Sequence, residues 1–388
     1  MKRFLLKLGL AFPMLAGMVW VNWSGDPALL FDDHQNDPAR HKYENAIAKD
    51  LLAGRTHYQL EEFSEWIVDG VIFRNRPKID SLVFGTSIGK PIHQGLFGSA
   101  QFYNASIHGG HLEDMPGLYE LALDCGIHLR QVLIVIDVYG LGYSLVALPM
   151  KQNAYVEKAC RRLHVTDGGT DPFAVWKALG RSLIPSGAAA DPENGRGPFY
   201  PYDELLSPRY FQYSFPYFAE AWVLPDRQPF RRAAGGGFEQ LLYPDGSIQW
   251  SQSLRYLSPE YVREKVNDAT KIDSIATHPG PPRGRPARLF EAFVADLVQS
   301  GIELDFLLLP PNPWLYDLAE KAAKRAGKPV VSVDAEAYVR ALAKKHQARV
   351  RGSLNPRRVG VTGEDYIDDV HLRRESLERL LKTLKPDG

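Results

Sequence analysis

The chain has 388 residues, of which 45% are hydrophobic, and it carries 46 basic and 46 acidic residues. These values are typical of a globular protein with a sizeable core, and the zero formal net charge argues against a nucleic-acid surface. The two cysteines, Cys125 and Cys160, are too few for a disulfide framework or a zinc site, but they could form one bridge.

The first 23 residues predict a segment that directs the chain to a membrane. Basic residues within the first seven positions precede the uncharged run 8–21, and Trp20 and Trp23 lie where interfacial aromatic residues are expected. The pattern fits a secretory signal peptide or a signal anchor, and the lack of a small-x-small cleavage site favours the anchor. The inner membrane is then a partner, with the body on the periplasmic side, or secreted if the segment is cleaved. A buried N-terminal helix is the alternative.

Helices and strands alternate in the next part of the chain. Residues 24–79 form a predicted helical connector, with apolar positions at helical spacing in 43–52 and 60–68. Strands are then predicted at 82–84, 102–105 and 131–138, with a helix over 112–123. The third strand is the most apolar run of the body, which is typical of a central strand of a parallel sheet.

Regular alternation stops over 141–283, a region rich in Gly, Pro and aromatic residues. Such a length predicts an inserted cap with its own structure, in which the turn 243–247 closes a hairpin. The aromatic residues could line a sugar or acyl site, or form a small core of their own.

Alternation resumes after residue 283 and predicts the remainder of the sheet. Strands are expected at 304–309 and 330–333, with helices at 287–297, 314–326 and 335–345 and a last helix ending at 384. Together, 80–140 and 284–388 predict one α/β domain, a three-layer α/β/α sandwich with a mostly parallel sheet.

A serine, an aspartate and a histidine occupy informative places in this pattern. Ser87 lies in the turn Gly85–Gly89 that ends the first predicted strand, where open α/β sheets bind ligands. Asp368 and His371 lie just before the last helix. Asp368 can accept a ring N–H of His371 and fix its tautomer, while the other ring nitrogen takes the proton of Ser87.

These blocks resemble the SGNH (GDSL-like) hydrolase superfamily. Residues 84–87 match the first block with its serine, 104–109 the second, and Asp368 with His371 the last. The resemblance implies a flavodoxin-like fold in which Ser87 is the nucleophile, and in which the N–H groups of Ser87 and Gly109 form the oxyanion hole. Within the second block, His108 and Asn104 are candidate substrate contacts.

The third block departs from the family pattern Gly-x-Asn-Asp, whose asparagine donates to the oxyanion. Here the strand runs into Asp137 and Val138, with Tyr139 near the asparagine position. A tyrosine hydroxyl could donate instead, whereas an ionised Asp137 would oppose the oxyanion. Losing one donor costs a factor of about 10²–10³ in such chemistry.

The architecture also resembles a divergent, membrane-anchored branch of the superfamily, similar to proteins of teichoic-acid D-alanylation and alginate O-acetylation. This implies an exported serine esterase or O-acyltransferase that acts on an acyl ester of a cell-surface or exported polysaccharide. A membrane-bound acyltransferase is then a possible partner, and no cofactor is needed. Hydrolysis and transfer remain open.

Three alternatives are weighed against this reading. The altered third block allows a catalytically inactive SGNH-like subunit that binds or assembles a polysaccharide complex. The turn 85–89 also matches the nucleophile elbow of α/β-hydrolases, but that elbow normally follows several strands. His108, His111 and Asp114 could suggest a metal site, but their spacing favours solvated residues at a helix entry, so no metal is predicted.

Overall fold

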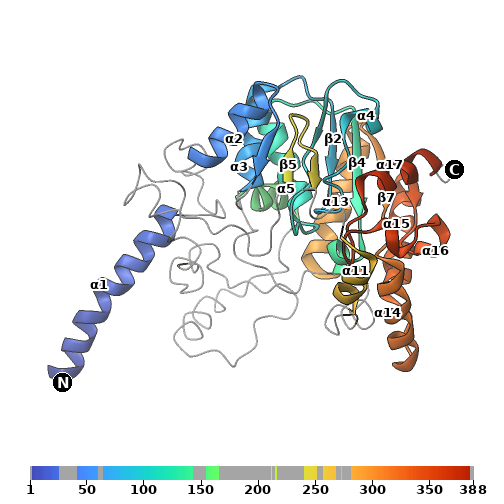
Figure 1. Ribbon diagram of the computed structural model, residues 1–388. Coiled ribbons are helices and arrows are strands. Elements are labelled where there is room, and N and C mark those ends of the chain that lie inside the picture. Colours follow the sequence, from blue (N-terminus) through green and yellow to red (C-terminus); the bar gives the residue numbers. More distant parts are fainter. Residues whose placement is uncertain are drawn as a thin grey trace.

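The computed structural model describes residues 2–25, 42–59, 64–142, 154–165, 240–250, 257–267 and 281–384, together with the single residues 211, 215 and 272. The fold is mixed α/β, with a five-stranded parallel sheet and a small three-stranded antiparallel sheet (Figure 1). Most of the predicted cap, 141–283, lies outside the described residues.

The parallel sheet has the strand order β3-β2-β4-β7-β8. Its strands are β2 (Ser81–Phe84), β3 (Phe102–Asn104), β4 (Gln131–Ile136), β7 (Glu303–Leu308) and β8 (Arg349–Gly352). The first of these strands in the chain therefore lies between the second and the third. Such a reversal of strand order leaves a crevice at the carboxyl ends of the strands, which is where ligands bind in open α/β sheets.

Apolar side chains cover both faces of the sheet, because successive strand residues point to opposite sides. Leu82 and Phe84 belong to a large buried cluster with helices α3 (Glu65–Asn75), α5 (Asp114–Asp124), α13 (Gly284–Gln299) and α15 (Val331–His346). Val83 belongs to a second cluster that includes helix α17 (Arg374–Thr383). This packing holds the strand ends, and hence the loops that follow them, in fixed positions.

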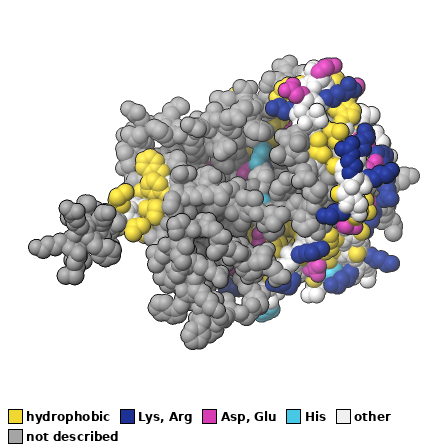
Figure 2. Space-filling view, turned by 90° about the horizontal axis from the view of Figure 1, so that it is seen from below, with side chains coloured by type: hydrophobic (Ala, Val, Ile, Leu, Met, Phe, Trp, Pro, Cys, Tyr) yellow, Lys and Arg dark blue, Asp and Glu magenta, His cyan; other side chains and the backbone are white. Residues whose placement is uncertain are grey.

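The remaining elements surround this core. They are α1 (Lys2–Gly25), α2 (Lys42–Leu52), β1 (His57–Gln59), α4 (Gln94–Phe97), α6 (Val138–Gly142), α7 (Ala154–Arg162), β5 (Gln240–Leu242), β6 (Ile248–Trp250), α11 (Pro259–Val266), α14 (Pro313–Arg325), α16 (Pro356–Val359) and a 3₁₀ turn (Gly363–Asp365). On the face shown in Figure 2, basic and acidic side chains are interspersed. None of the helices in the described ranges is long and apolar enough to cross a membrane.

The predicted hairpin is confirmed, as are the first four strands of the parallel sheet, although their ends differ by a residue or two. Strands β5 and β6 pair antiparallel across the turn 243–247, with the Tyr243 N–H donating to the Ser247 carbonyl at 2.8 Å. Both cysteines are free thiols, so the bridge left open by the sequence does not form.

The strand predicted at 330–333 is wrong, because helix α15 begins at Val331. The fifth strand is instead β8, an edge strand of alternating basic residues without an apolar run. Arg349 and Arg351 donate to the buried Asp305 carboxylate on β7 at 2.5 and 2.9 Å. Charge pairing across the edge thus replaces the apolar pattern by which strands are recognised.

Candidate active site

Ser87, His371 and Asp368 come together in one hydrogen-bonded chain, although 284 residues separate the serine from the histidine. His371 Nε2 lies 2.8 Å from Ser87 Oγ, and His371 Nδ1 lies 2.7 Å from Asp368 Oδ2. Both distances are within the range of good hydrogen bonds. This is the nucleophile–base–carboxylate order on which serine hydrolysis depends.

A tight turn positions the acid and the base. Asp368 Oδ1 accepts the backbone N–H groups of Val370 and His371 at 2.9 and 2.7 Å. The Ile367 N–H donates to the His371 carbonyl at 2.9 Å, which closes the turn. Both carboxylate oxygens of Asp368 are therefore engaged, so the side chain has one orientation relative to the imidazole.

Asn312, which follows strand β7, holds this turn through two hydrogen bonds and is fully buried. Its backbone N–H donates to the Asp369 carbonyl and its side-chain amide to the Asp368 carbonyl, each at 2.9 Å. Its side-chain oxygen caps helix α14 by accepting the Trp314 N–H at 3.0 Å. The turn that carries Asp368 and His371 is thereby tied to the segment that follows strand β7.

The charged groups around His371 raise the pKa of its imidazole. Burial alone would lower the pKa of His371, but the Asp368 carboxylate, helped by Asp369 and Asp137, raises it above its usual value. Burial alone would raise the pKa of Asp368, but His371 and the two backbone N–H groups hold it below its usual value. Both shifts have one main source, because the Asp368 carboxylate and the protonated imidazole stabilise each other.

The loop that carries Ser87 packs too closely for larger residues. A Cβ at Gly89 would lie 2.8 Å from Ser106 Oγ and 3.2 Å from a methyl group of Val135. The predicted substrate contact Asn104 lies beneath this loop and is fully buried, and its amide donates to the carbonyls of Gly89 and Ile92 at 2.9 and 2.8 Å. Asn104 thus supports the serine loop, and its side chain is occupied there.

The predicted oxyanion donors lie on two loops joined by hydrogen bonds. The Ser87 backbone N–H donates to no other group within the described residues. Gly109 has a φ of +55°, in a turn whose Ile107 N–H donates to the Gly85 carbonyl at 3.0 Å. That bond fixes the Gly109 loop against the end of β2, two residues before the serine.

Asp137 is a helix cap in this arrangement. Its Oδ1 accepts the N–H groups of Tyr139 and Gly140 at 2.7 and 2.8 Å, and its Oδ2 accepts the Thr86 hydroxyl at 2.6 Å. Three donors and the start of helix α6 thus compensate the charge that was expected to oppose the oxyanion. The Tyr139 hydroxyl lies 3.4 Å from Asp369 Oδ2, a long contact beside the triad.

Trp250, at the end of strand β6, forms part of the site and was missed as a site residue. Its ring is 2% exposed and makes edge contacts with His371 and His108, at centroid distances of 5.0 and 5.9 Å. The hairpin that carries Trp250 docks on the serine loop, where the Ile248 N–H donates to the Lys90 carbonyl at 3.0 Å. The aromatic residues of the region 141–283 were the sequence signal that could have pointed to Trp250 as a site residue.

Glu65 links the two loops that carry the oxyanion donors. Its Oε1 accepts the His108 backbone N–H at 3.1 Å and faces His108 Nδ1 at 2.5 Å, and it lies 3.5 Å from the Lys90 ammonium. Burial alone would raise the pKa of Glu65, but Lys90 and His108 outweigh it and lower the pKa to about 2. Lys90 belongs to the Ser87 loop and His108 to the Gly109 loop, so one carboxylate sets their relative position.

We expect Glu65→Gln to lower kcat for a small ester by about 10- to 100-fold with little change in KM, because oxyanion donors act mainly in the transition state. The variant also leaves the buried Lys90 ammonium unpaired, which costs about 3–5 kcal/mol of unfolding free energy. The double variant Glu65→Gln with Lys90→Met should recover stability without recovering kcat. Recovery of both in urea unfolding and steady-state kinetics would show that Glu65 has only a structural role.

No metal site is found in the described ranges, where no group of three or more His, Cys, Asp or Glu side chains is placed to hold an ion. His108 bonds to Glu65, and the His111 backbone N–H donates to Asp114 Oδ2 at 2.7 Å as part of the entry to helix α5.

A comparison with models of known protein families found no match, and a comparison with curated protein sequences found no significant similarity.

Proposed function

We propose that this chain is an exported serine esterase or O-acyltransferase of SGNH type. The observation that carries the proposal is the hydrogen-bonded chain from Ser87 through His371 to Asp368 at the carboxyl end of strand β2. Acyl transfer requires a serine, a base that takes its proton and a group that orients the base. Here the base His371 lies 2.8 Å from Ser87 Oγ, and the Asp368 carboxylate lies 2.7 Å from the other ring nitrogen of His371.

In the proposed reaction Ser87 Oγ attacks the carbonyl carbon of an acyl ester while His371 Nε2 takes the hydroxyl proton. The N–H groups of Ser87 and Gly109, with Tyr139 beside them, stabilise the oxyanion. His371 then returns the proton to the leaving alkoxide, which departs as an alcohol and leaves an acyl-serine. Water or a sugar hydroxyl, deprotonated by His371, then attacks the acyl carbon of the acyl-serine. His371 returns the proton to Ser87 Oγ as the bond between Oγ and the acyl carbon breaks, and the acyl group leaves as a free acid or as a new ester.

The substrate class proposed is an acyl ester of a cell-surface or exported polysaccharide. This substrate class requires that the protein be exported, and export is supported by the N-terminal pattern, in which basic residues precede the uncharged run 8–21. The proposal places the catalytic body on the periplasmic side, anchored by residues 1–23 or released after their cleavage. A membrane-bound acyltransferase is the proposed source of acyl groups if the reaction is transfer.

The proposal extends to the finer architecture. Residues 80–140 and 284–388 would form a three-layer α/β/α sandwich of the flavodoxin-like SGNH kind, with 24–79 as a helical connector and 141–283 as a cap. The strand order β3-β2-β4-β7-β8 and the apolar packing on both faces of the sheet support this reading. A cap over the strand ends would set the specificity of the site.

The alternative function is a binding or assembly subunit without catalysis, for which the missing third-block asparagine is the specific observation. Two features weigh against it. The Asp137 carboxylate that stands there is compensated by three hydrogen-bond donors. Binding alone also gives no reason for a histidine within 2.8 Å of a serine and 2.7 Å of an aspartate.

Turnover of a chromogenic acetyl ester tests the proposal. The wild-type chain should release the chromophore, and Ser87→Ala should fall to the uncatalysed rate, because Ser87 supplies the hydroxyl that lies 2.8 Å from His371 Nε2. Addition of a polysaccharide acceptor separates transfer from hydrolysis, since transfer yields an acetylated glycan at the expense of free acetate. Equal turnover by both folded proteins would refute Ser87 as the nucleophile.

A further inference from the structure

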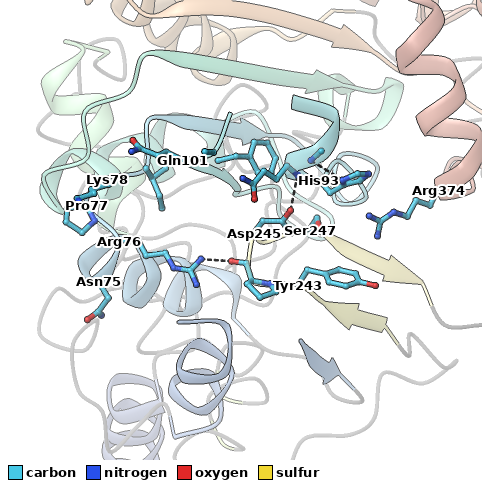
Figure 3. A pocket seen from close by; sticks show the side chains of 16 residues that line it. Asn75, Arg76, Pro77, Lys78, His93, Gln101, Tyr243, Asp245, Ser247 and Arg374 are labelled. Carbon is cyan, nitrogen blue, oxygen red and sulfur yellow. Dashed lines mark hydrogen bonds between the residues drawn. The ribbon is translucent and has the colours of Figure 1, made fainter. Parts of the chain in front are cut away.

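A cavity of about 780 Å³ lies about one short strand away from the candidate active site and has no role in the reaction described above (Figure 3). It is enclosed by the turn of the β5–β6 hairpin, the start of strand β3, the segment after helix α3 and the first residue of helix α17. Its size falls within the range of small-molecule sites, about 300–1,000 Å³. The cavity is therefore large enough for a specific ligand.

Positive charge dominates the side chains that line this cavity. Arg76, Lys78 and Arg374 line it, and Asp245 is the one carboxylate among the lining residues. Asp245 is already engaged, because its oxygens accept the Gln94 N–H at 2.9 Å and the Ser247 hydroxyl at 2.6 Å. The cavity therefore presents net positive charge to a ligand.

Lys78 and Arg374 have N–H donors that no described group uses. The Lys78 ammonium is exposed and makes no hydrogen bond or ion pair within the described residues. Arg374 is held in place, because its Nε donates to Glu378 at 3.2 Å and its guanidinium lies over the Tyr243 ring at 5.4 Å. Both terminal nitrogens of Arg374 are unused by other described groups. A fixed guanidinium fork of this kind suits a carboxylate or phosphate group.

The cavity is connected to the reacting groups through two short segments. Arg374 follows His371 by three residues, and strand β6 runs from next to Ser247 at the cavity to Trp250 at the His371 ring. Three strand residues span about 10 Å. The cavity and the His371 ring are thus about one short strand apart, a separation that an oligosaccharide of a few units is long enough to span.

We propose that this cavity is a subsite for an anionic segment of a carbohydrate, an inference that rests on the proposed function for its choice of a glycan. Arg374 and Lys78 bind the acidic group, and the side-chain amides of Gln94 and Gln101 on the cavity wall suit hydroxyl groups. The acidic group is a carboxylate or a phosphate carried on sugar units. A polysaccharide bound here would present an ester on a neighbouring unit to Ser87.

The test is equilibrium binding by calorimetry to the full chain carrying Ser87→Ala, so that no turnover occurs. The ligands are an oligogalacturonate, a phosphorylated oligosaccharide and a neutral oligosaccharide of the same length, with inorganic phosphate alone as a fourth. We expect one of the two acidic oligosaccharides to bind, and its affinity to fall as ionic strength rises. Lys78→Gln and Arg374→Gln should each weaken it about tenfold or more, whereas Lys328→Gln, an exposed lysine on another surface, should not.

Several outcomes would overturn the proposal. These are binding of neither acidic oligosaccharide, equal binding of the neutral one, or affinity unchanged by both substitutions in the cavity. Inorganic phosphate that binds as tightly as the acidic oligosaccharides would refute the carbohydrate assignment. Because binding is measured without the nucleophile, its failure is distinct from failure of the proposed function.

Discussion

Replacing His371 by alanine should reduce kcat for a small acyl ester by about 10⁴-fold or more. The Ser87 hydroxyl is a weak nucleophile at neutral pH, and His371 Nε2, which lies 2.8 Å away, is its proposed proton acceptor. Without the imidazole, the serine has no base at that distance, and the leaving alkoxide has no acid. KM should change little, because the imidazole acts on protons of the transition state rather than on the bound substrate.

His128→Ala is the matched control for this experiment, because His128 is exposed and makes no described contact. The control should keep wild-type kcat, and both variants should show cooperative unfolding in urea. A fold-change below about tenfold for His371→Ala, in a folded protein, would mean that another group takes the Ser87 proton.

The second large effect is expected for Asp368→Asn, which should lower kcat by about 10⁴-fold. The amide is nearly isosteric, but two backbone N–H groups keep its oxygen at the Oδ1 position, so its NH2 group, a donor, faces His371 Nδ1 in place of the carboxylate oxygen at 2.7 Å. The imidazole then loses the tautomer that leaves Nε2 free to accept the Ser87 proton. The imidazolium formed in the transition state also loses its countercharge.

The pH profile separates this role from a structural one. His371 must be neutral to accept a proton, so kcat/KM of the wild type should rise with pH through a pKa above the usual value of this group, 6.5. Asp368→Asn removes the main charge that raises this pKa, so the rising limb should move to lower pH. Asp369→Asn is the control, because the Asp369 charge raises the pKa of His371 less than the Asp368 charge does, so the variant should shift the limb less and keep most of kcat. An unmoved limb in Asp368→Asn would contradict the assignment of His371 as the base.

The triad residues could be found from the sequence because each follows a recognisable local pattern. Ser87 ends an apolar strand in a glycine turn, and Asp368 with His371 precedes the last helix at a spacing that one turn accommodates. The hydrogen bond between Ser87 and His371 depends on the order of strands in the sheet. That order is set by packing between distant segments, and local patterns predict it poorly.

Other parts of the site could not be found in this way. Glu65 and Lys90 are buried charges whose role depends on a partner elsewhere in the chain. The sequence around Asn312 predicts an ordinary helix cap. Its second role, a hydrogen bond that holds the Asp368 turn, depends on the fold. Strand β8 was missed because arginines that pair with Asp305 replace an apolar run. In each case a polar residue owes its place to a long-range contact that residue type does not predict.

The most direct test of the account is covalent labelling of the intact chain with a fluorophosphonate probe, read by peptide mass spectrometry. The probe reacts with serines whose hydroxyl is activated by a base and whose oxyanion is stabilised. The account predicts close to one label per chain, on the peptide that contains Ser87, and none in Ser87→Ala. A folded wild-type chain that takes up no label, or takes it up at another residue, would contradict the claim that these three residues form a working catalytic triad.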